Sequence, residues 1–323
     1  MENFEFHLDN FMLYCESKNL SRKTLSSYEQ TLKLFQFYME REHSITEVSD
    51  VRSGHVRMYI KYLRDRGKYT VVSNERSLNV NYPDRRTDTG KDISDTTISN
   101  YIRNIKVFFN FLYTEREIQN NPVQKLENIK PNRKKKPLLK REEIIRMLKQ
   151  MDTSTFHEYR LWMQTRLILD TGLRIGECCN VKPEDIDFKY NSILVTNPKN
   201  KKERYVYFSF KLGRELKRWL KYRDRFSDSE YVFPTIRGTK QDIRNFERAL
   251  RKSGERVGVR VHPHQLRNNF AKFYLLNGGD WVSLSRILGH SSAEVTQKHY
   301  LDFTEDEIRI KYNDHSPIQG LDI

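Results

Sequence analysis

Apolar side chains recur every three to four positions along the first 120 residues, and this spacing constrains the fold more than any other feature. Such a period places the apolar residues on one face of a helix. The pattern predicts helices over 4–17, 22–42 and about 51–66, and a fourth from 95 to near 118. Four amphipathic helices with mostly short connections predict a helical bundle.

The ends of these helices carry signals of their own. Ser21 can accept a hydrogen bond from a free backbone N–H of the second helix, and Ser94 or Asp95 can do the same for the fourth. Gly67 is placed to end the third helix. We expect the aromatic residues of the fourth helix to enter the core: Phe108, Phe109, Phe111 and Tyr113.

Residues 68–92 separate the third and fourth helices and are rich in Asn, Asp, Thr, Ser and Arg, with no sustained apolar period. They could form a long loop or a short hairpin, or a disordered insertion. Long loops inside compact domains are uncommon and often functional.

A basic segment follows the fourth helix. Asn121-Pro122 disfavours further helix, and residues 130–136 read KPNRKKK before Pro137. Such a run can be an ordinary solvated stretch, but between two folded regions it predicts an interdomain linker. We expect its lysines to lie across DNA phosphates: Lys134, Lys135 and Lys136.

The second half of the chain contains stretches with the helical period and stretches with the two-residue period of strands. Helices are predicted over 140–150, 158–171, 212–222, 242–257, 263–276 and 280–288. Two β-rich runs, 192–196 and 204–209, flank a polar turn and predict a hairpin. Further helices are predicted after Ser291 or Ser292 and from the capping-box pair Thr304 and Glu307. This half is therefore expected to be mostly α with a small antiparallel sheet.

Composition narrows the class of partner and compartment. The net charge of +15 favours a polyanion as partner, although charge alone does not choose among polyanions. No apolar run is long enough for a membrane span, and the acidic, mixed N-terminus is not a secretory signal. Three cysteines give no disulfide framework, which favours a reducing cytoplasm. Cys178 and Cys179 are expected to be small buried thiols.

Five segments stand out in order as carriers of chemistry. They are TGLRIGE (171–177), NPKNKKER (197–204), HPHQLRNNF (262–270), LGHSS (288–292) and TQKHY (296–300). Together they supply arginines, lysines, histidines and one tyrosine, without a carboxylate pair or a P-loop. Arginine forks can grip the nonbridging oxygens of a phosphoryl transition state. A tyrosine can attack phosphorus, and lysine or histidine can move the protons.

These segments resemble the signature of the tyrosine recombinases, the family of phage integrases, Xer-type resolvases and related transposon enzymes. The likeness spans 171–300, and SRKTLSSYEQTLKLFQFY near the N-terminus resembles the family's core-binding helices. The resemblance implies a four-helix SAM-like core-binding domain over 1–126 with an insertion at about 68–94. It also implies a linker over 127–137 and a mixed α/β catalytic domain over 138–323.

The resemblance also implies a role for each matching residue. Arg174 and Arg267 match the two phosphate-gripping arginines. Tyr300 matches the nucleophile. His264 matches the proton acceptor for that tyrosine, and His290 the phosphate or leaving-group donor.

Two further matches complete the set. Lys199 matches the hairpin lysine that protonates the leaving 5′-oxygen, with Lys201 and Lys202 close enough to leave the choice open. Glu177 matches a carboxylate that supports the active-site arginines. Exposed basic residues are expected to contact DNA: Lys201, Lys202, Arg244 and Arg248.

Two departures from the family pattern touch neighbouring positions. Asn268-Asn269 stands where the family often has His-Thr or His-Ser, and we expect no loss of activity from it. His299 lies where some members place the nucleophile, but the ten-residue spacing from His290 favours Tyr300.

The implied reaction needs no cofactor and no metal. A zinc site is disfavoured because the histidines and cysteines lack C-x-x-C or H-x-x-x-H spacing. The expected partners are double-stranded recombination sites, other copies of the chain in a homotetramer on DNA, and accessory bending or directionality factors. The resemblance implies a prokaryotic, nucleoid-associated enzyme. A phage or transposon origin is preferred to a chromosomal role because of residues 68–92.

Two rival functions remain open on sequence. A non-catalytic DNA-binding protein could keep the fold, but it should have lost a catalytic position, and none is lost here. A type IB topoisomerase-like nicking enzyme shares the tyrosine and arginine chemistry, but separate core-binding helices favour a recombinase. Joining of a trapped covalent complex to a second duplex would discriminate the two.

Overall fold

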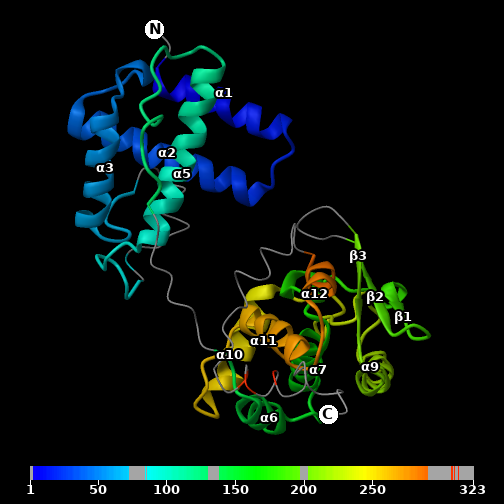
Figure 1. The fold of residues 1–323 in the computed structure, drawn as a ribbon. Helices are drawn as coiled ribbons and strands as arrows, with labels where there is room; N and C mark the ends of the chain where they lie inside the picture. The colour runs from blue at the N-terminus through cyan, green and yellow to red at the C-terminus, as the bar shows by residue number, and fades with distance from the viewer. Residues whose placement is uncertain are drawn as a thin grey trace, which may run out of the picture. The chain divides into compact units, whose positions relative to one another are not determined.

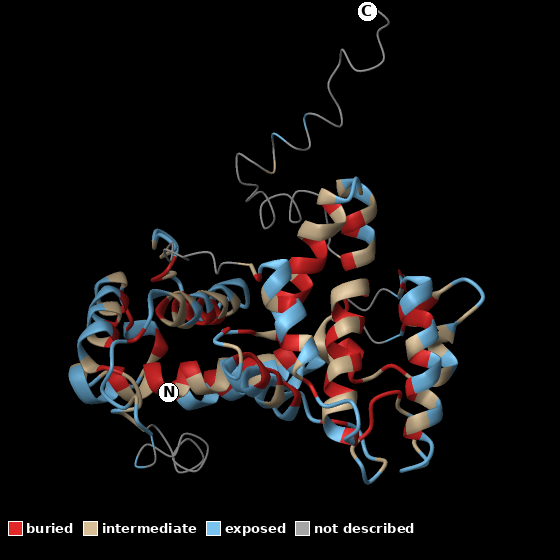
Figure 2. Ribbon diagram, turned by 90° about the horizontal axis from the view of Figure 1, so that it is seen from below, coloured by how far each residue is buried: buried red, intermediate tan, exposed pale blue. Residues whose placement is uncertain are grey.

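The computed structural model describes residues 3–72, 84, 86–129, 138–196, 203–289, 307, 309 and 312. It divides into two compact units, Met1–Lys135 and Lys136–Ile323 (Figure 1). Each unit has its own apolar core, and within each the buried residues form stripes along the helices (Figure 2). In the described residues, no helix is both long and apolar enough to cross a membrane.

The first unit is built from α1 (Phe4–Ser17), α2 (Arg22–His43), α3 (Ser53–Arg66) and α5 (Asp95–Thr114), with a 3-10 turn η1 (Val48–Asp50). The predicted helices are therefore confirmed, with small shifts at their ends. Ser21 and Ser94 cap α2 and α5, since their side chains accept from the backbone N–H groups three residues on.

Aromatic rings fill the centre of this unit. Phe108 lies 5.7 Å from Phe4 and 5.4 Å from Phe11 between ring centroids, so α5 packs against α1. Asn104, also buried, donates from Nδ2 to the Thr31 hydroxyl at 3.0 Å and so links α5 to α2. A buried polar contact of this kind favours the pairing of these two helix faces.

The end of α5 differs from the prediction in two respects. The helix stops at Thr114 and not near Ile118, because Arg116 adopts a left-handed backbone with φ 64°. Tyr113 is 48% exposed, although we expected it in the core. The buried stripe runs through Ile105, Phe108, Phe109 and Leu112, which leaves Tyr113 on the outer face.

The ends of the segment 68–92 lie together. The backbone N–H of Lys68 donates to the Lys91 carbonyl, and the N–H of Gly90 donates to the Lys68 carbonyl, each at 2.8 Å. The predicted loop, hairpin or disordered insertion falls mostly on residues 73–83 and 85, which lie outside the described residues.

The second unit is mostly helical with a three-stranded antiparallel sheet in the order β1-β2-β3. Its strands are β1 (Ile186–Asp187), β2 (Ser192–Val195) and β3 (Arg204–Tyr207). β2 and β3 form the predicted hairpin, with Val195 opposite Arg204, while β1 was not predicted. The predicted combination of mostly α structure and a small antiparallel sheet is confirmed.

The helix α7 (Phe156–Thr171) runs through the middle of this unit and packs against α9, α10 and α11 (Figure 1). The other elements are given in chain order: α6 (Arg141–Lys149), α8 (Ile175–Cys178), η3 (Pro183–Asp185), α9 (Phe210–Arg223), α10 (Ile243–Glu255), α11 (Pro263–Leu276) and α12 (Trp281–Leu288). Leu161, Leu167 and Ile168 of α7 are buried, so the end of this helix is held firmly in the core.

Candidate active site

The turn after α7 presents the first predicted arginine. Gly172 ends the helix in a left-handed conformation with φ 67°, which favours glycine. A Cβ at this position would lie 2.4 Å from Cδ1 of Phe270, so a larger residue would also collide with α11. The Thr171 hydroxyl donates to the Leu167 carbonyl at 2.6 Å and accepts from the Leu173 N–H at 3.3 Å. The Thr-Gly pair therefore fixes the path of the chain into Arg174.

Arg174 is held by a carboxylate three residues later. Its backbone N–H donates to Oε2 of Glu177 and its Nη1 donates to Oε1, both at 2.9 Å. This arrangement caps the short helix α8 and restrains the guanidinium. The Arg174 side chain is 28% exposed, so the held fork still reaches solvent.

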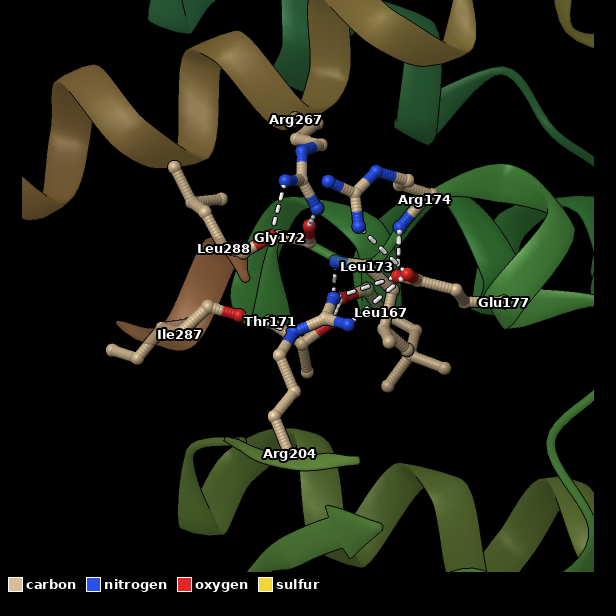
Figure 3. A network of polar contacts seen from close by, with 10 residues as sticks. All are labelled: Leu167, Thr171, Gly172, Leu173, Arg174, Glu177, Arg204, Arg267, Ile287 and Leu288. Atoms are coloured by element: carbon tan, nitrogen blue, oxygen red, sulfur yellow. Dashed lines mark hydrogen bonds and ion pairs between the residues drawn. The ribbon is translucent and has the colours of Figure 1, made fainter. Parts of the chain in front are cut away.

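A second arginine, Arg204, grips the same carboxylate. Its Nη2 and Nη1 donate to Oε2 and Oε1 of Glu177 at 2.7 and 3.0 Å, and its Nε donates to the Ile287 carbonyl at 2.8 Å (Figure 3). Although Arg204 ends the charged run KNKKER, its side chain is only 9% exposed. The strand period explains this, because Arg204 shares the inward face of β3 with Val206, while Tyr205 and Tyr207 face out.

The Glu177 carboxylate is ionised. Burial raises its pKa, but hydrogen bonds and charge from Arg204, together with the hydrogen bonds from Arg174, outweigh burial and hold the pKa below its usual value. A buried carboxylate needs a charged partner, and Arg204, which donates to both of its oxygens, is the principal one here.

Arg267 joins the end of α7 to the end of α12. Its Nη1 donates to the Gly172 carbonyl at 2.5 Å and its Nη2 to the Leu288 carbonyl at 2.6 Å (Figure 3). The residue is 2% exposed. The two predicted arginines therefore lie at one turn of the chain, because Arg267 bonds the carbonyl of Gly172, two residues before Arg174.

His264 and Asn269 lie on the same helix as Arg267. Pro263 is the first residue of α11, His264 the second, and His264 is exposed one turn before Arg267. Asn269 is fully buried, donating from Nδ2 to the Leu139 carbonyl at 2.7 Å and accepting from the Leu139 N–H at 3.2 Å. The departure from the family pattern thus serves to hold the first residues after the basic linker.

The other predicted residues divide into two groups. Arg244 and Arg248 are exposed and one turn apart on α10, as DNA contacts require. The remaining ones lie outside the described residues: Lys134, Lys135, Lys136, Lys199, Lys201, Lys202, His290 and Tyr300. The described elements nevertheless show where two of these segments join the fold. β3 begins at Arg204, directly after the hairpin loop, and Gly289 caps α12 one residue before His290.

The paired cysteines are buried, as expected. Cys178 and Cys179 are both 0% exposed. Burial raises the pKa of Cys179 to about 11 and that of Cys178 well above its usual value. These thiols therefore stay protonated and belong to the core and not to the chemistry.

Comparison with known proteins identifies the family. The model of the Phage integrase family matches residues 137–307, more than half of the chain, and that of the N-terminal SAM-like domain of phage integrases matches residues 8–81. Tyrosine recombinase XerC of Oceanobacillus iheyensis is 28% identical over 326 residues, which cover 98% of both chains.

Solved structures share the fold at low identity. The Tn1549 transposon integrase in complex with a circular intermediate DNA has a TM-score of 0.74 at 16% identity, covering 98% of this chain and 100% of that one. A lambda integrase tetramer bound to a Holliday junction has a TM-score of 0.68 at 16% identity, covering 94% and 79%. With both family models matched in order along its length, the chain belongs to the phage integrase family and is a tyrosine recombinase.

Proposed function

We propose that this recombinase cuts and rejoins DNA at paired sites, with Tyr300 as the nucleophile and Arg174 and Arg267 as the phosphate-binding residues. The observation that carries the proposal is the anchoring of both arginines on the turn 172–174. Groups held before the reaction stabilise developing charge without having to reorganise during it.

The proposed reaction conserves the energy of the bond that it breaks. The Tyr300 oxygen attacks phosphorus as its proton passes to His264, and the bond from phosphorus to the 5′-oxygen breaks. Lys199 protonates that oxygen, which leaves a 3′-phosphotyrosyl bond and a 5′-hydroxyl. The hydroxyl of a partner duplex then attacks the phosphotyrosine, giving a Holliday junction that a second round resolves. Because each step exchanges one phosphodiester for another, neither ATP nor a metal is required.

The assembly is proposed from the comparisons, and the biological role from the sequence. We expect four protomers to act on two DNA sites, as the lambda integrase tetramer on a Holliday junction suggests. The preference for a mobile-element role rests on residues 68–92, and the Xer name of the full-length relative weighs against it. Paired inverted repeats at an element boundary beside the gene would support the mobile role, and their absence a chromosomal one.

The proposed chemistry is tested with Tyr300→Phe. Phenylalanine keeps the ring and removes only the attacking oxygen, so this variant should bind DNA but form no covalent adduct on a nicked suicide duplex in EDTA. Tyr312→Phe is the matched control, since Tyr312 is an exposed tyrosine twelve residues later, and it should form the adduct normally.

The readout is a denaturing gel, followed by addition of a second duplex to detect joining. An adduct formed by Tyr300→Phe would exclude Tyr300 as nucleophile. Wild-type cleavage that EDTA abolishes and Mg²⁺ restores would exclude the metal-free chemistry.

A further inference from the structure

Arg204 connects three segments of the site that are far apart in sequence. It is the first residue of β3, directly after the loop that carries Lys199. Its guanidinium bonds both oxygens of Glu177, and its Nε bonds the carbonyl of Ile287 near the end of α12. A Cβ on Gly289 would lie 2.9 Å from its Cδ, so the arginine stem runs close beside the residue before His290.

A purely stabilising salt bridge would not need this arrangement. Buried ion pairs often contribute little net stability compared with apolar side chains of the same size. Here the three donors reach acceptors on two separate segments, and both acceptors belong to the frame of the site. Only a guanidinium offers several donors in one plane, so lysine cannot reproduce the contacts.

We propose that Arg204 is a positioning residue of the recombination chemistry. It orients Arg174 through their shared carboxylate and holds the end of α12 against the start of β3. It thereby links three segments of the chain. These are the one that follows Lys199, the one that contains Arg174 and the one that precedes His290. This inference rests on the proposed function, because it assumes that those residues act on one phosphate.

The position of Arg204 predicts which kinetic step it affects. Unlike Arg174 and Arg267, Arg204 matches no phosphate-binding position of the family, and its donors already bond Glu177 and the Ile287 carbonyl, so we assign it no contact with DNA. Loss of its contacts should therefore slow covalent adduct formation and leave DNA affinity unchanged. Small displacements of a reacting group, even from a distant substitution, can cost on the order of 10²-fold in rate.

The test compares Arg204→Lys with Arg223→Lys. Arg223 is the matched control because its side chain is 8% exposed and its Nη1 bonds the Tyr231 carbonyl at 2.6 Å, outside the site. We expect adduct formation under single-turnover conditions on the nicked duplex to fall about 100-fold for Arg204→Lys. Arg223→Lys should cleave at the wild-type rate, and gel-shift affinity should be unchanged in both.

A double variant separates positioning from general loosening. If Arg204 acts through Arg174, then Arg204→Lys should slow Arg174→Lys much less than it slows the wild type, because coupled residues are not additive. Fully multiplicative effects, or cleavage by Arg204→Lys at the wild-type rate, would overturn the inference.

Glu177→Gln covers the case in which Arg204→Lys does not fold. Glutamine keeps the shape and one acceptor but presents an amide to the other guanidinium, so slow cleavage with normal binding is again expected. Cleavage by Glu177→Gln at the wild-type rate would also overturn the inference. Failure of the wild type to form an adduct at Tyr300 would instead contradict the proposed function.

Discussion

The two predicted arginines differ in how much of the fold depends on them. Arg267 is 2% exposed and satisfies the carbonyls of Gly172 and Leu288, whereas Arg174 is partly exposed and bonds one carboxylate. A buried carbonyl that loses its donor costs about 1–3 kcal/mol. Arg267 therefore has a structural role beside its proposed catalytic one. The structural role of Arg174 is much smaller.

This difference can be measured with alanine variants. Arg174→Ala and Arg267→Ala should each slow cleavage by on the order of 10²- to 10³-fold, because each removes one charged fork. Only Arg267→Ala should also lower the melting temperature clearly. Single-turnover cleavage and thermal unfolding of the same preparations test both statements. Wild-type cleavage by either variant would reject its catalytic assignment, and equal melting temperatures would reject the structural distinction.

Glu177 should make stability depend on pH in a definite direction. Its pKa is lowered in the folded protein, so it binds a proton less readily there than in the unfolded chain. Its contribution is therefore fully present above its unfolded pKa, near 4.5, and is lost as the pH falls through its lower folded pKa.

The measurement is the free energy of unfolding of wild type and Glu177→Gln between pH 7 and pH 3. The advantage of the wild type should be constant near neutrality and shrink on acidification below the unfolded pKa. The comparison isolates Glu177, since other carboxylates with lowered pKa values, such as Glu158 and Asp280, are common to both proteins. A difference that does not vary with pH would mean that the two arginines do not hold the charge of Glu177.

Among the helices and strands, features that depend on neighbouring residues were predicted correctly, and features that depend on distant residues were not. The caps Ser21 and Ser94 act on backbone groups three residues away, so a short stretch of sequence contains all that defines them. The end of α5 depends on the left-handed backbone of Arg116. Glycine or asparagine at this position would have predicted such a conformation, but arginine does not.

The site shows the same division. Arg174 was found from the local motif TGLRIGE, although the turn at Gly172 was not predicted. Arg204 was missed because it closes a run of charged residues, although the period of β3 places it on the same face as Val206. Neither Leu139 nor Asn269 indicates a partner 130 residues away along the chain. The short strand β1 gave no alternating pattern long enough to recognise.

At the scale of the whole molecule, the C-terminal segment bears on assembly. Nζ of Lys272 on α11 lies 2.7 Å from Oε1 of Glu307, so the segment after the proposed nucleophile contacts its own domain at this residue. Residues 313–323 lie outside the described residues and contain Ile318, Leu321 and Ile323, which are more apolar than a free tail needs. This segment can pack on its own domain or on a neighbouring protomer, and the family resemblance adds weight to the second.

Deletion of residues 314–323 tests this role. The Lys272–Glu307 contact is kept, so binding to a single site should be nearly normal, while pairing of two sites and recombination should be impaired. Gel-shift titrations on one-site and two-site DNA, with a recombination assay, measure the difference. Normal pairing and recombination by the shortened protein would show that the segment acts only within its own chain.

The two separate cores have a consequence for how this sequence can change over time. The first core includes Phe4, Phe35 and Phe108, and the second includes Leu167, Trp219 and Phe246, so each unit draws its stability from its own residues. A substitution that weakens one core leaves the other intact. In evolutionary terms, the interiors of the two units can therefore change independently of each other.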